Sequence, residues 1–303
     1  MLATARDHWL DFWHALPPFR GRLAISRLVA ERLMTNANNQ VAWAKLPNGF
    51  RVQVDLRWRG GYDSLYYFRT YEQPLASLIR HAVDAPGATF IDVGANVGVF
   101  TFLVADVLRK RNGRALAIEP LPANFAFLTA GIAANGLADV VDAQQVAVGD
   151  HPGELRIQPL YSGVIANAVP LGWRTSKSVP HQEDDVVVPM QTLDALTRAP
   201  GLTNVRFVKI DIEGAELFAL RGAEELLARD RPLVYCEFHR EYMAINGTSL
   251  DDILAFARRL DYAVRYLGSD GHLDDTPQQP RYLDAVLVPH SPNVRDSRRP
   301  TQS

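Results

Sequence analysis

A strict alternation of strand-like and helix-like segments dominates the chain from residue 89 onward. Short apolar runs such as residues 89–93, 114–118 and 233–237 are separated by stretches of helical periodicity. Strands that alternate with helices pair in parallel through right-handed crossovers. The last two strands, residues 263–267 and 282–288, are joined by a turn without a helix, which predicts an antiparallel edge strand. We therefore expect an α/β fold with a mostly parallel, seven-stranded sheet and helices on both faces.

The rest of the chain divides into an extension, an interruption and a tail. Residues 1–70 are expected to form an N-terminal extension, helical at first and then a hairpin over residues 41–56. The α/β domain is expected to span residues 71–290. A segment rich in Ser, Gly, Pro and Asn interrupts it at residues 160–185, and a loop of this length is usually functional or mobile. Residues 291–303 are polar and are expected to be a disordered tail.

Composition excludes several classes of protein. The net charge is −2, so the chain lacks the basic footprint that a nucleic-acid binder needs. The single cysteine, Cys236, excludes a disulfide framework and a thiolate zinc site, and we expect a reducing, cytoplasmic location. No apolar run reaches the roughly 18 residues of a membrane span, so no transmembrane segment is expected. Self-association into a homo-oligomer is left open.

The turn after the first strand of the alternation is the first candidate for a binding site. In open parallel sheets, ligands bind beyond the carboxyl ends of the strands. A dinucleotide needs the pattern G-x-G-x-x-G, but here Asn96 stands where the middle glycine would be. The acidic Asp92 also disfavours a phosphate and suits a cationic group such as an amino-acid ammonium. Alternatively, Asp92 only satisfies backbone donors.

The second strand ends in Glu119, directly before Pro120. A carboxylate at this place can accept hydrogen bonds from both hydroxyls of a ribose, because it carries several acceptor sites. The two turns together therefore favour an adenosine ligand with an ammonium and no pyrophosphate, and S-adenosylmethionine is such a ligand.

At these residues the sequence resembles the FkbM family of S-adenosylmethionine-dependent methyltransferases. The likeness is carried by residues 71–72, 91–98, 119–120, 208–216 and 237–239. It implies a Rossmann-like methyltransferase fold and transfer of a methyl group to a hydroxyl of a small metabolite, such as a sugar, a glycoside or a polyketide. It also implies, by position, a set of residues that line the cofactor: Asp92, Gly94, Ala95, Asn96, Gly98, Glu119, Asp142 and Ala147.

Candidate catalytic side chains lie at the ends of the fourth and fifth strands of the alternation. They are Lys209, Asp211, Glu237 and His239. An alcohol is a poor nucleophile, so a base or a metal must help to remove its proton. His239 is the expected general base, because the ordinary pKa of histidine is near 6.5. Alternatively, Asp211, Glu237 and His239 hold a divalent ion such as Mg²⁺, or His239 is a structural histidine. Lys209 is expected to pair with a carboxylate or to orient the acceptor.

Substrate contacts are expected from outside the strand ends. Glu72 precedes the first helix of the domain and is expected to shape the pocket. Residues 160–185 are a candidate acceptor lid, in which Trp173 and Arg174 supply stacking and hydrogen bonding. Two other functions stay open at this point. The chain could be a nicotinamide-dependent oxidoreductase on a similar sheet, or a protein that binds the cofactor without catalysis.

Overall fold

The computed structural model of the chain describes most of the α/β domain and the hairpin before it. The described residues are 41–56, 65–67, 69, 72–160, 167–171, 185–199, 201–276 and 282–290, together with Leu10, Phe12, Trp13 and Ile25. The predicted helical stretch at residues 1–35 and the tail at 291–303 lie outside them almost entirely, as does most of the segment 160–185. The domain limits therefore stay predictions.

The main sheet of the described residues has eight strands in the order β13-β12-β14-β11-β10-β3-β4-β5. Their bounds are β3 Thr89–Val93, β4 Arg114–Ile118, β5 Val141–Gln144, β10 Val205–Ile210, β11 Leu233–His239, β12 Tyr262–Leu267, β13 Leu273–Asp274 and β14 Tyr282–Pro289. The strands from β5 to β11 pair in parallel, and β14 is antiparallel to both of its neighbours. This arrangement confirms the expected fold class.

Two details of the predicted sheet are wrong. The antiparallel strand β14 is not at the edge, because it lies between β11 and β12. The helical crossover from β11 to β12 leaves room for one strand between them. The chain then forms the short strand β13 and returns as β14, which fills that place. That extra strand β13 forms the edge, so the sheet has one strand more than the sequence predicted.

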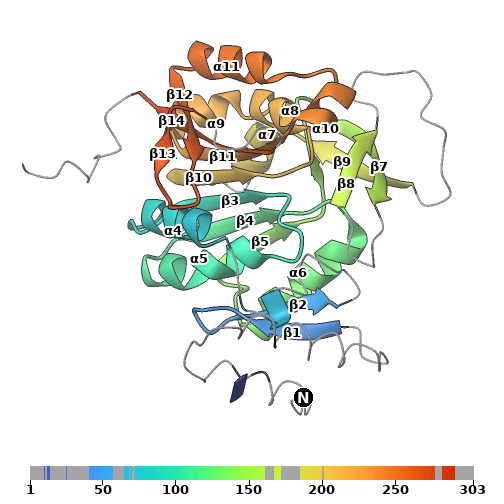
Figure 1. Cartoon of the computed structure of the whole chain (residues 1–303), viewed down its shortest axis with the longest axis vertical. Helices are drawn as coiled ribbons and strands as arrows, with labels where there is room; N and C mark the ends of the chain where they lie inside the picture. The colour runs from blue at the N-terminus through green and yellow to red at the C-terminus, as the bar shows by residue number, and fades with distance from the viewer. Residues whose placement is uncertain are drawn as a thin grey trace, which may run out of the picture.

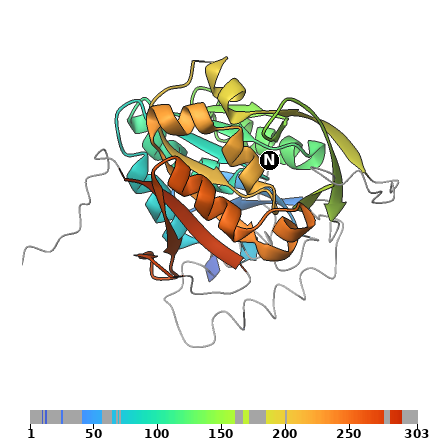
Figure 2. The ribbon, with the colours of Figure 1, turned by 90° about the horizontal axis from the view of Figure 1, so that it is seen from above.

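Helices cover both faces of the sheet (Figure 1). Helices α4 (Gln73–Ala82), α5 (Val99–Lys110) and α6 (Pro122–Ala134) lie on one face. Helices α7 (Leu193–Arg198), α8 (Glu216–Arg221), α9 (Glu224–Asp230), α10 (Arg240–Ile245) and α11 (Leu250–Arg259) lie on the other. Seen from above, the orange helix α11 lies beside the red strand β14 (Figure 2). The expected helix over residues 215–229 is thus two helices. They are separated at Gly222, where an added Cβ would lie 2.0 Å from the backbone oxygen of Gly149.

A second, smaller sheet has the order β6-β9-β7-β8. Its strands are β6 Ala147–Val148, β7 Gly153–Leu160, β8 Asn167–Leu171 and β9 Val186–Gln191. The sequence predicted one strand over residues 140–148, but the structure divides this stretch between β5 of the main sheet and β6 of the second. Part of the expected loop at 160–185 is also a strand, since β8 pairs antiparallel with β7.

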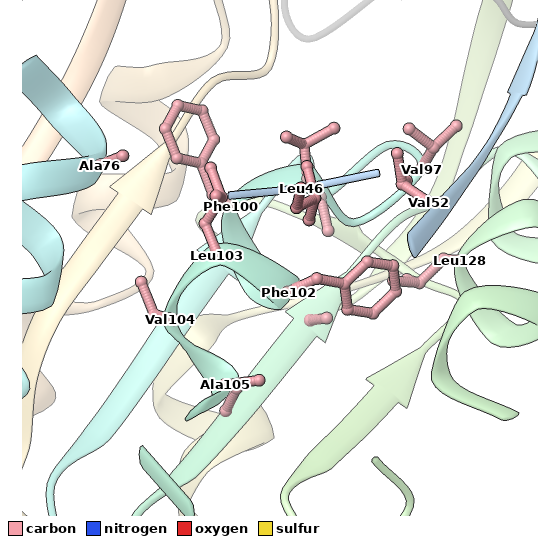
Figure 3. Close-up of a cluster of buried hydrophobic side chains, with 14 of the residues drawn as sticks. Leu46, Val52, Ala76, Val97, Phe100, Phe102, Leu103, Val104, Ala105 and Leu128 are labelled. Atoms are coloured by element: carbon pink, nitrogen blue, oxygen red, sulfur yellow. The ribbon is translucent and has the colours of Figure 1, made fainter. Parts of the chain in front are cut away.

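The predicted hairpin forms from β1 (Val41–Lys45) and β2 (Arg51–Asp55) and packs on α5 and α6. In its turn, Asn48 Nδ2 donates to the backbone oxygen of Phe102 at 2.8 Å and to Asp106 Oδ1 at 3.0 Å. Leu46 and Val52 belong to one apolar cluster with Phe102 and Leu128 (Figure 3). The hairpin therefore shares the core of the α/β domain. Among the described residues, no helix is both long enough and apolar enough to cross a membrane.

Candidate active site

Three neighbouring strands place polar side chains on one face of the sheet, close to their carboxyl ends. Asp92 of β3 is the register partner of Lys209 of β10, which in turn is the partner of Tyr235 of β11. Register partners on neighbouring strands project to the same side of a sheet. This is the face that carries α4 and α5. The polar row therefore lies where ligands bind in open parallel sheets.

Lys209 stands at the centre of this row and is almost wholly buried. Its Nζ lies 3.4 Å from Asp92 Oδ1 and 3.3 Å from Asp211 Oδ2, and it donates a hydrogen bond of 3.2 Å to the backbone oxygen of Gly94. Burial opposes the charged ammonium, but Asp211 and Asp92 outweigh this and raise the pKa of Lys209. The expectation that Lys209 pairs with a carboxylate is confirmed, and it pairs with two.

The carboxylate of Asp92 is directed into the protein. Its side chain is 1% exposed, and Thr101 Oγ1 of α5 donates to its Oδ2 at 2.6 Å. Lys209 provides the opposite charge. Asp92 therefore already has protein partners for the charge that the sequence assigned to a ligand ammonium. Sequence reasoning missed Thr101, for which the signal was a hydroxyl in the otherwise apolar first turns of α5.

The glycines of the turn after β3 permit close packing of protein on protein. Gly94, Asn96 and Gly98 all have left-handed backbones, with φ of 73°, 52° and 89°. A Cβ on Gly94 would lie 2.0 Å from the backbone oxygen of Asp211, and one on Gly98 would lie 2.6 Å from Leu128 Cδ1. Gly94 thus lets the turn touch the end of β10, and Gly98 lets α5 begin against α6.

Glu119 follows β4 and holds this turn through its side chain. Its Oε2 accepts a hydrogen bond of 2.9 Å from the backbone nitrogen of Asn96. Its Oε1 accepts from the backbone nitrogen of Leu121 at 3.0 Å and from Asn124 Nδ2 at 3.3 Å. Burial raises the pKa of Glu119 to about 7, although these hydrogen bonds act in the opposite direction.

The acceptors of this turn fit the ribose hydroxyls of an adenosine. A carboxylate has about four acceptor positions, so Glu119 keeps about one, on Oε2, for a ribose hydroxyl. Asn96 Oδ1 is buried and has no hydrogen-bond partner among the described residues, and it is a second acceptor at the same turn. Acceptor oxygens and carboxylates suit hydroxyl and ammonium donors, whereas they repel a pyrophosphate. S-Adenosylmethionine therefore fits these residues better than a dinucleotide does.

Two further residues predicted to line the cofactor, Ala147 and Asp142, lie apart from each other. Ala147 is buried in β6 and packs in one apolar cluster with Leu121, two residues after Glu119. Asp142 is exposed and accepts a hydrogen bond of 3.0 Å from Gln144 Nε2. Because Asp142 is the register partner of Leu116, it points to the opposite face from Asp92. The structure thus brings Ala147 to the Glu119 side and leaves Asp142 apart.

Five carboxyl groups influence one another beyond the polar row that contains Lys209. We call them the acidic cluster: Glu72, Asp211, Glu213, Glu237 and Asp284. Glu237 and Asp284 face each other across β11 and β14. Burial and then Asp211 raise the pKa of Glu72. This coupling is consistent with the predicted position of Glu72 beside the pocket. Sequence reasoning missed Asp284, which was visible as a lone carboxylate in the middle of an apolar strand.

The acidic cluster contains two carboxyl groups with different protonation at neutral pH. Burial, followed by the charges of Asp211 and Glu72, raises the pKa of Glu237 to about 9. Burial and the charge of Asp211 raise the pKa of Glu213 to about 7. Glu237 is therefore protonated near pH 7 and can donate a hydrogen bond, whereas Glu213 is about half ionised and can accept a proton. Groups with such different pKa values are typical of acid–base sites.

The side chains of Glu216 and Asn246 hold the turn that carries Glu213. Glu213 and Gly214 both have left-handed backbones, with φ of 53° and 93°. Glu216 Oε1 accepts from the backbone nitrogens of Ile212 at 3.3 Å and Gly214 at 3.0 Å, and Asn246 Nδ2 donates to the oxygen of Gly214 at 3.2 Å. Glu213 lies before the next helix, because α8 starts at Glu216. Non-glycine residues in this conformation are uncommon, and strained ones cluster at active sites.

His239 ends β11 and caps α10. Its Nδ1 accepts a hydrogen bond of 3.4 Å from the backbone nitrogen of Tyr242, and the two rings stack with centroids 3.9 Å apart. A neutral imidazole that accepts at Nδ1 carries its proton on Nε2, which is then a donor. This tautomer does not serve a general base at Nε2, so the predicted role of His239 stays a hypothesis.

The remaining predictions concern metal binding and the acceptor lid. Among the described residues, no group of three or more His, Cys, Asp or Glu side chains is arranged to hold a metal ion. The alternative that Asp211, Glu237 and His239 bind Mg²⁺ therefore finds no support in the structure. Trp173 and Arg174 of the candidate lid lie outside the described residues.

A sheet of this topology, with a glycine-rich but acidic first turn and a carboxylate after the second strand, defines the Rossmann-like methyltransferase class. The family model of the methyltransferase FkbM domain matches residues 92–264, more than half of the chain. The chain belongs to this family.

Curated relatives carry related names. The chain is 28% identical over 170 residues to the 31-O-demethyl-FK506 methyltransferase FkbM of Streptomyces tacrolimicus, over 48% of this chain and 64% of the relative. It is 27% identical over 153 residues to Methyltransferase 1 of Beauveria bassiana (strain ARSEF 2860), over 46% of this chain and 60% of the relative. The chain thus spans less than two thirds of the length of either. The crystal structure of methyltransferase FkbM from Methylobacillus flagellatus KT shares 18% identity, with a TM-score of 0.43, over 68% of this chain and 44% of that one.

Proposed function

We propose that the chain is an S-adenosylmethionine-dependent methyltransferase that methylates a hydroxyl of a small metabolite, such as a sugar, a glycoside or a polyketide. Membership of the FkbM family supports methyl transfer. The observation that carries the choice of cofactor is the pair of buried acceptors at the first turn, Glu119 Oε2 beside the backbone of Asn96 and the unpartnered Asn96 Oδ1. When bound, the cofactor supplies a methyl group activated by the positive charge of its sulfonium.

The residues of the chain then have separable tasks. Glu119 and Asn96 receive the donors of the cofactor, while Lys209 fixes the first turn to the end of β10 through Asp92 and Asp211. The acidic cluster receives the acceptor hydroxyl. Glu237, protonated near pH 7, donates a hydrogen bond to the acceptor, and Glu213 takes the proton of the reacting hydroxyl. His239 is the alternative proton acceptor that the sequence predicts.

The cofactor is tested by thermal-shift titration of the purified chain with S-adenosylhomocysteine and, in parallel, with NADH. Ligands that bind only the folded state raise the unfolding temperature, and at equal concentration a tighter ligand raises it more. We expect stabilisation by S-adenosylhomocysteine and none by NADH; the reverse result would favour a nicotinamide-dependent oxidoreductase. Glu119→Gln should weaken S-adenosylhomocysteine about tenfold or more, because a charged hydrogen bond contributes roughly 1.5–3 kcal/mol. The matched control is Glu225→Gln, which alters an exposed ion pair with Arg198.

The reaction is tested with methyl-labelled S-adenosylmethionine and a panel of sugars, glycosides and polyketides. Glu213→Gln should reduce kcat about a hundredfold or more while S-adenosylhomocysteine binding is kept, because general-base catalysis contributes about 10²–10⁴-fold. Tight binding of S-adenosylhomocysteine without transfer to any acceptor would instead support a protein that binds the cofactor without catalysis.

A further inference from the structure

Buried Tyr235 and half-buried Asp284 form a hydrogen-bonded pair to which the proposed function gives no separate task. Tyr235 lies on β11, in register with Lys209 of β10 and Val286 of β14, and its side chain is 2% exposed. Its hydroxyl donates a hydrogen bond of 2.5 Å to Asp284 Oδ1. Asp284 is also the direct register partner of Glu237 across β11 and β14. The hydroxyl therefore acts on one member of a facing pair of carboxyl groups.

Two carboxyl groups on register partners of neighbouring strands do not both ionise at low cost, because their like charges repel. One proton is therefore retained by the pair near neutral pH, and its place depends on what else each group contacts. A hydrogen bond donated to a carboxylate stabilises its charged form. The hydroxyl of Tyr235 can donate one hydrogen bond, and Asp284 accepts it. This bond favours the charge on Asp284 and the proton on Glu237.

The other charged groups around Glu237 also favour its protonated form. Asp211, Glu72 and Glu213 all face it and add negative charge. The ammonium of Lys209 is bound by Asp92 and Asp211. Burial, and then the charges of Asp284 and Glu237, raise the pKa of Tyr235 well above its ordinary value. Tyr235 thus keeps its proton over the working pH range and remains a donor.

We propose that Tyr235 and Asp284 are positioning residues that fix the proton of the facing carboxyl pair on Glu237, so that Glu237 presents a hydrogen-bond donor to the acceptor. The role of this donor in methylation rests on the proposed function. The place of the proton does not, because it can be measured in the protein without any substrate.

The test is a carboxyl ¹³C NMR titration of the full chain labelled at Asp and Glu. The signals of Glu237 and Asp284 are assigned by their loss in Glu237→Gln and Asp284→Asn. In Tyr235→Phe, the protonated fraction of Glu237 at neutral pH should fall, because the hydrogen bond that stabilises the negative charge of Asp284 is lost. In Asp284→Asn, the midpoint of Glu237 should fall, because one of the negative charges that raise its pKa is removed.

Tyr262→Phe is the matched control. Tyr262 is also a buried tyrosine, but it packs with the core of the opposite face, where its hydroxyl donates to the backbone oxygen of Leu227 at 3.3 Å. This variant should leave the titration of Glu237 unchanged. The proposal is overturned if Tyr235→Phe, folded as well as Tyr262→Phe, titrates like the wild type. If Tyr235→Phe does not fold, an unchanged Glu237 midpoint in Asp284→Asn overturns it.

The consequence for methyl transfer is read from the pH profile. In Asp284→Asn, the alkaline limb of kcat/KM should move to lower pH, because Glu237 loses its proton earlier. A merely structural role would lower kcat without moving that limb, and such a result would contradict the proposal. If the wild type transfers no methyl group, the proposed function fails while the NMR titration still decides where the proton lies.

Discussion

Lys209 Nζ lies 3.4 Å from Asp92 Oδ1, and both side chains are at most 3% exposed. The two residues come from neighbouring strands, β10 and β3, which are more than a hundred residues apart in the chain. The same ammonium also reaches Asp211 and the backbone oxygen of Gly94. One buried charge therefore links the turn proposed to bind the cofactor to the acidic cluster proposed to bind the acceptor.

Lys209→Met should destabilise the folded chain by about 3–5 kcal/mol, because it leaves the buried charge of Asp92 without its partner. Methionine keeps the length and apolar stem of lysine, so the loss reports charge rather than volume. Urea denaturation at pH 7 measures the free energy of unfolding. Adding Asp92→Asn should recover part of the loss, since the uncompensated charge is then removed. A cost below about 1 kcal/mol for Lys209→Met would show that the pair is not a structural link.

Gly131→Ala should destabilise the chain although alanine is the better helix former. Gly131 is buried in α6, and an added Cβ would lie 2.5 Å from Phe102 Cε2 of α5. Phe102 packs in the apolar cluster with Leu128 (Figure 3). Overpacking costs about 1–3 kcal/mol, whereas the helix preference returns only about 1 kcal/mol. We expect a net loss of up to about 2 kcal/mol in urea denaturation.

The control for this prediction is the smaller partner Phe102→Leu. If the ring causes the clash, Gly131→Ala should cost less in the Phe102→Leu background, with a coupling of about 1 kcal/mol. Equal cost in both backgrounds would place the cause elsewhere.

The free energy of unfolding should fall as pH rises from 5 to 9. Burial raises the pKa of Glu216 from 4.5 to about 8 in the folded state, so the folded chain binds a proton that the unfolded chain releases. The associated stability is complete below pH 4.5 and is lost as pH rises through about 8. Glu119, Glu213 and Glu237 have raised pKa values and act with the same sign.

Glu216→Gln separates the contribution of this one residue. Glutamine keeps an acceptor oxygen for the backbone nitrogens of Ile212 and Gly214 but does not titrate. The decline between pH 5 and 9, measured by urea denaturation at each pH, should become shallower by an amount on the order of a few kcal/mol. The exposed control Glu225→Gln should leave the slope unchanged. A slope equally steep in Glu216→Gln would mean that Glu216 is already ionised in the folded chain.

The order of strands and helices could be predicted because each element carries its own periodicity. The apolar runs that became β3, β4 and β11 and the helical faces of α5 and α11 were visible locally. The place of β14 was not, because it depends on which side of β12 offers a free edge, and no local pattern encodes that. Splitting of the stretch at residues 140–148 between two sheets is likewise a tertiary effect.

The site was predictable as a set of strand ends but not as a set of roles. The alternation of Lys209 and Asp211 placed both at the end of β10, and the structure confirms their pairing. That Asp92 points inward to Thr101 was not predictable, since the partner is a hydroxyl one helix turn into α5. Asp284 was missed because a strand register across β14, and not sequence proximity, brings it to Glu237.

His239→Asn distinguishes a capping histidine from a catalytic one. Asparagine is a good N-cap residue and can accept from the backbone nitrogen of Tyr242 as Nδ1 of His239 does. If His239 only caps α10, His239→Ala should cost about 1 kcal/mol of stability, and His239→Asn should restore both stability and methyl transfer. If His239 is the base that the sequence predicts, both variants should lose methyl transfer while His239→Asn stays fully stable. Because Nδ1 already accepts from Tyr242, we expect the first outcome.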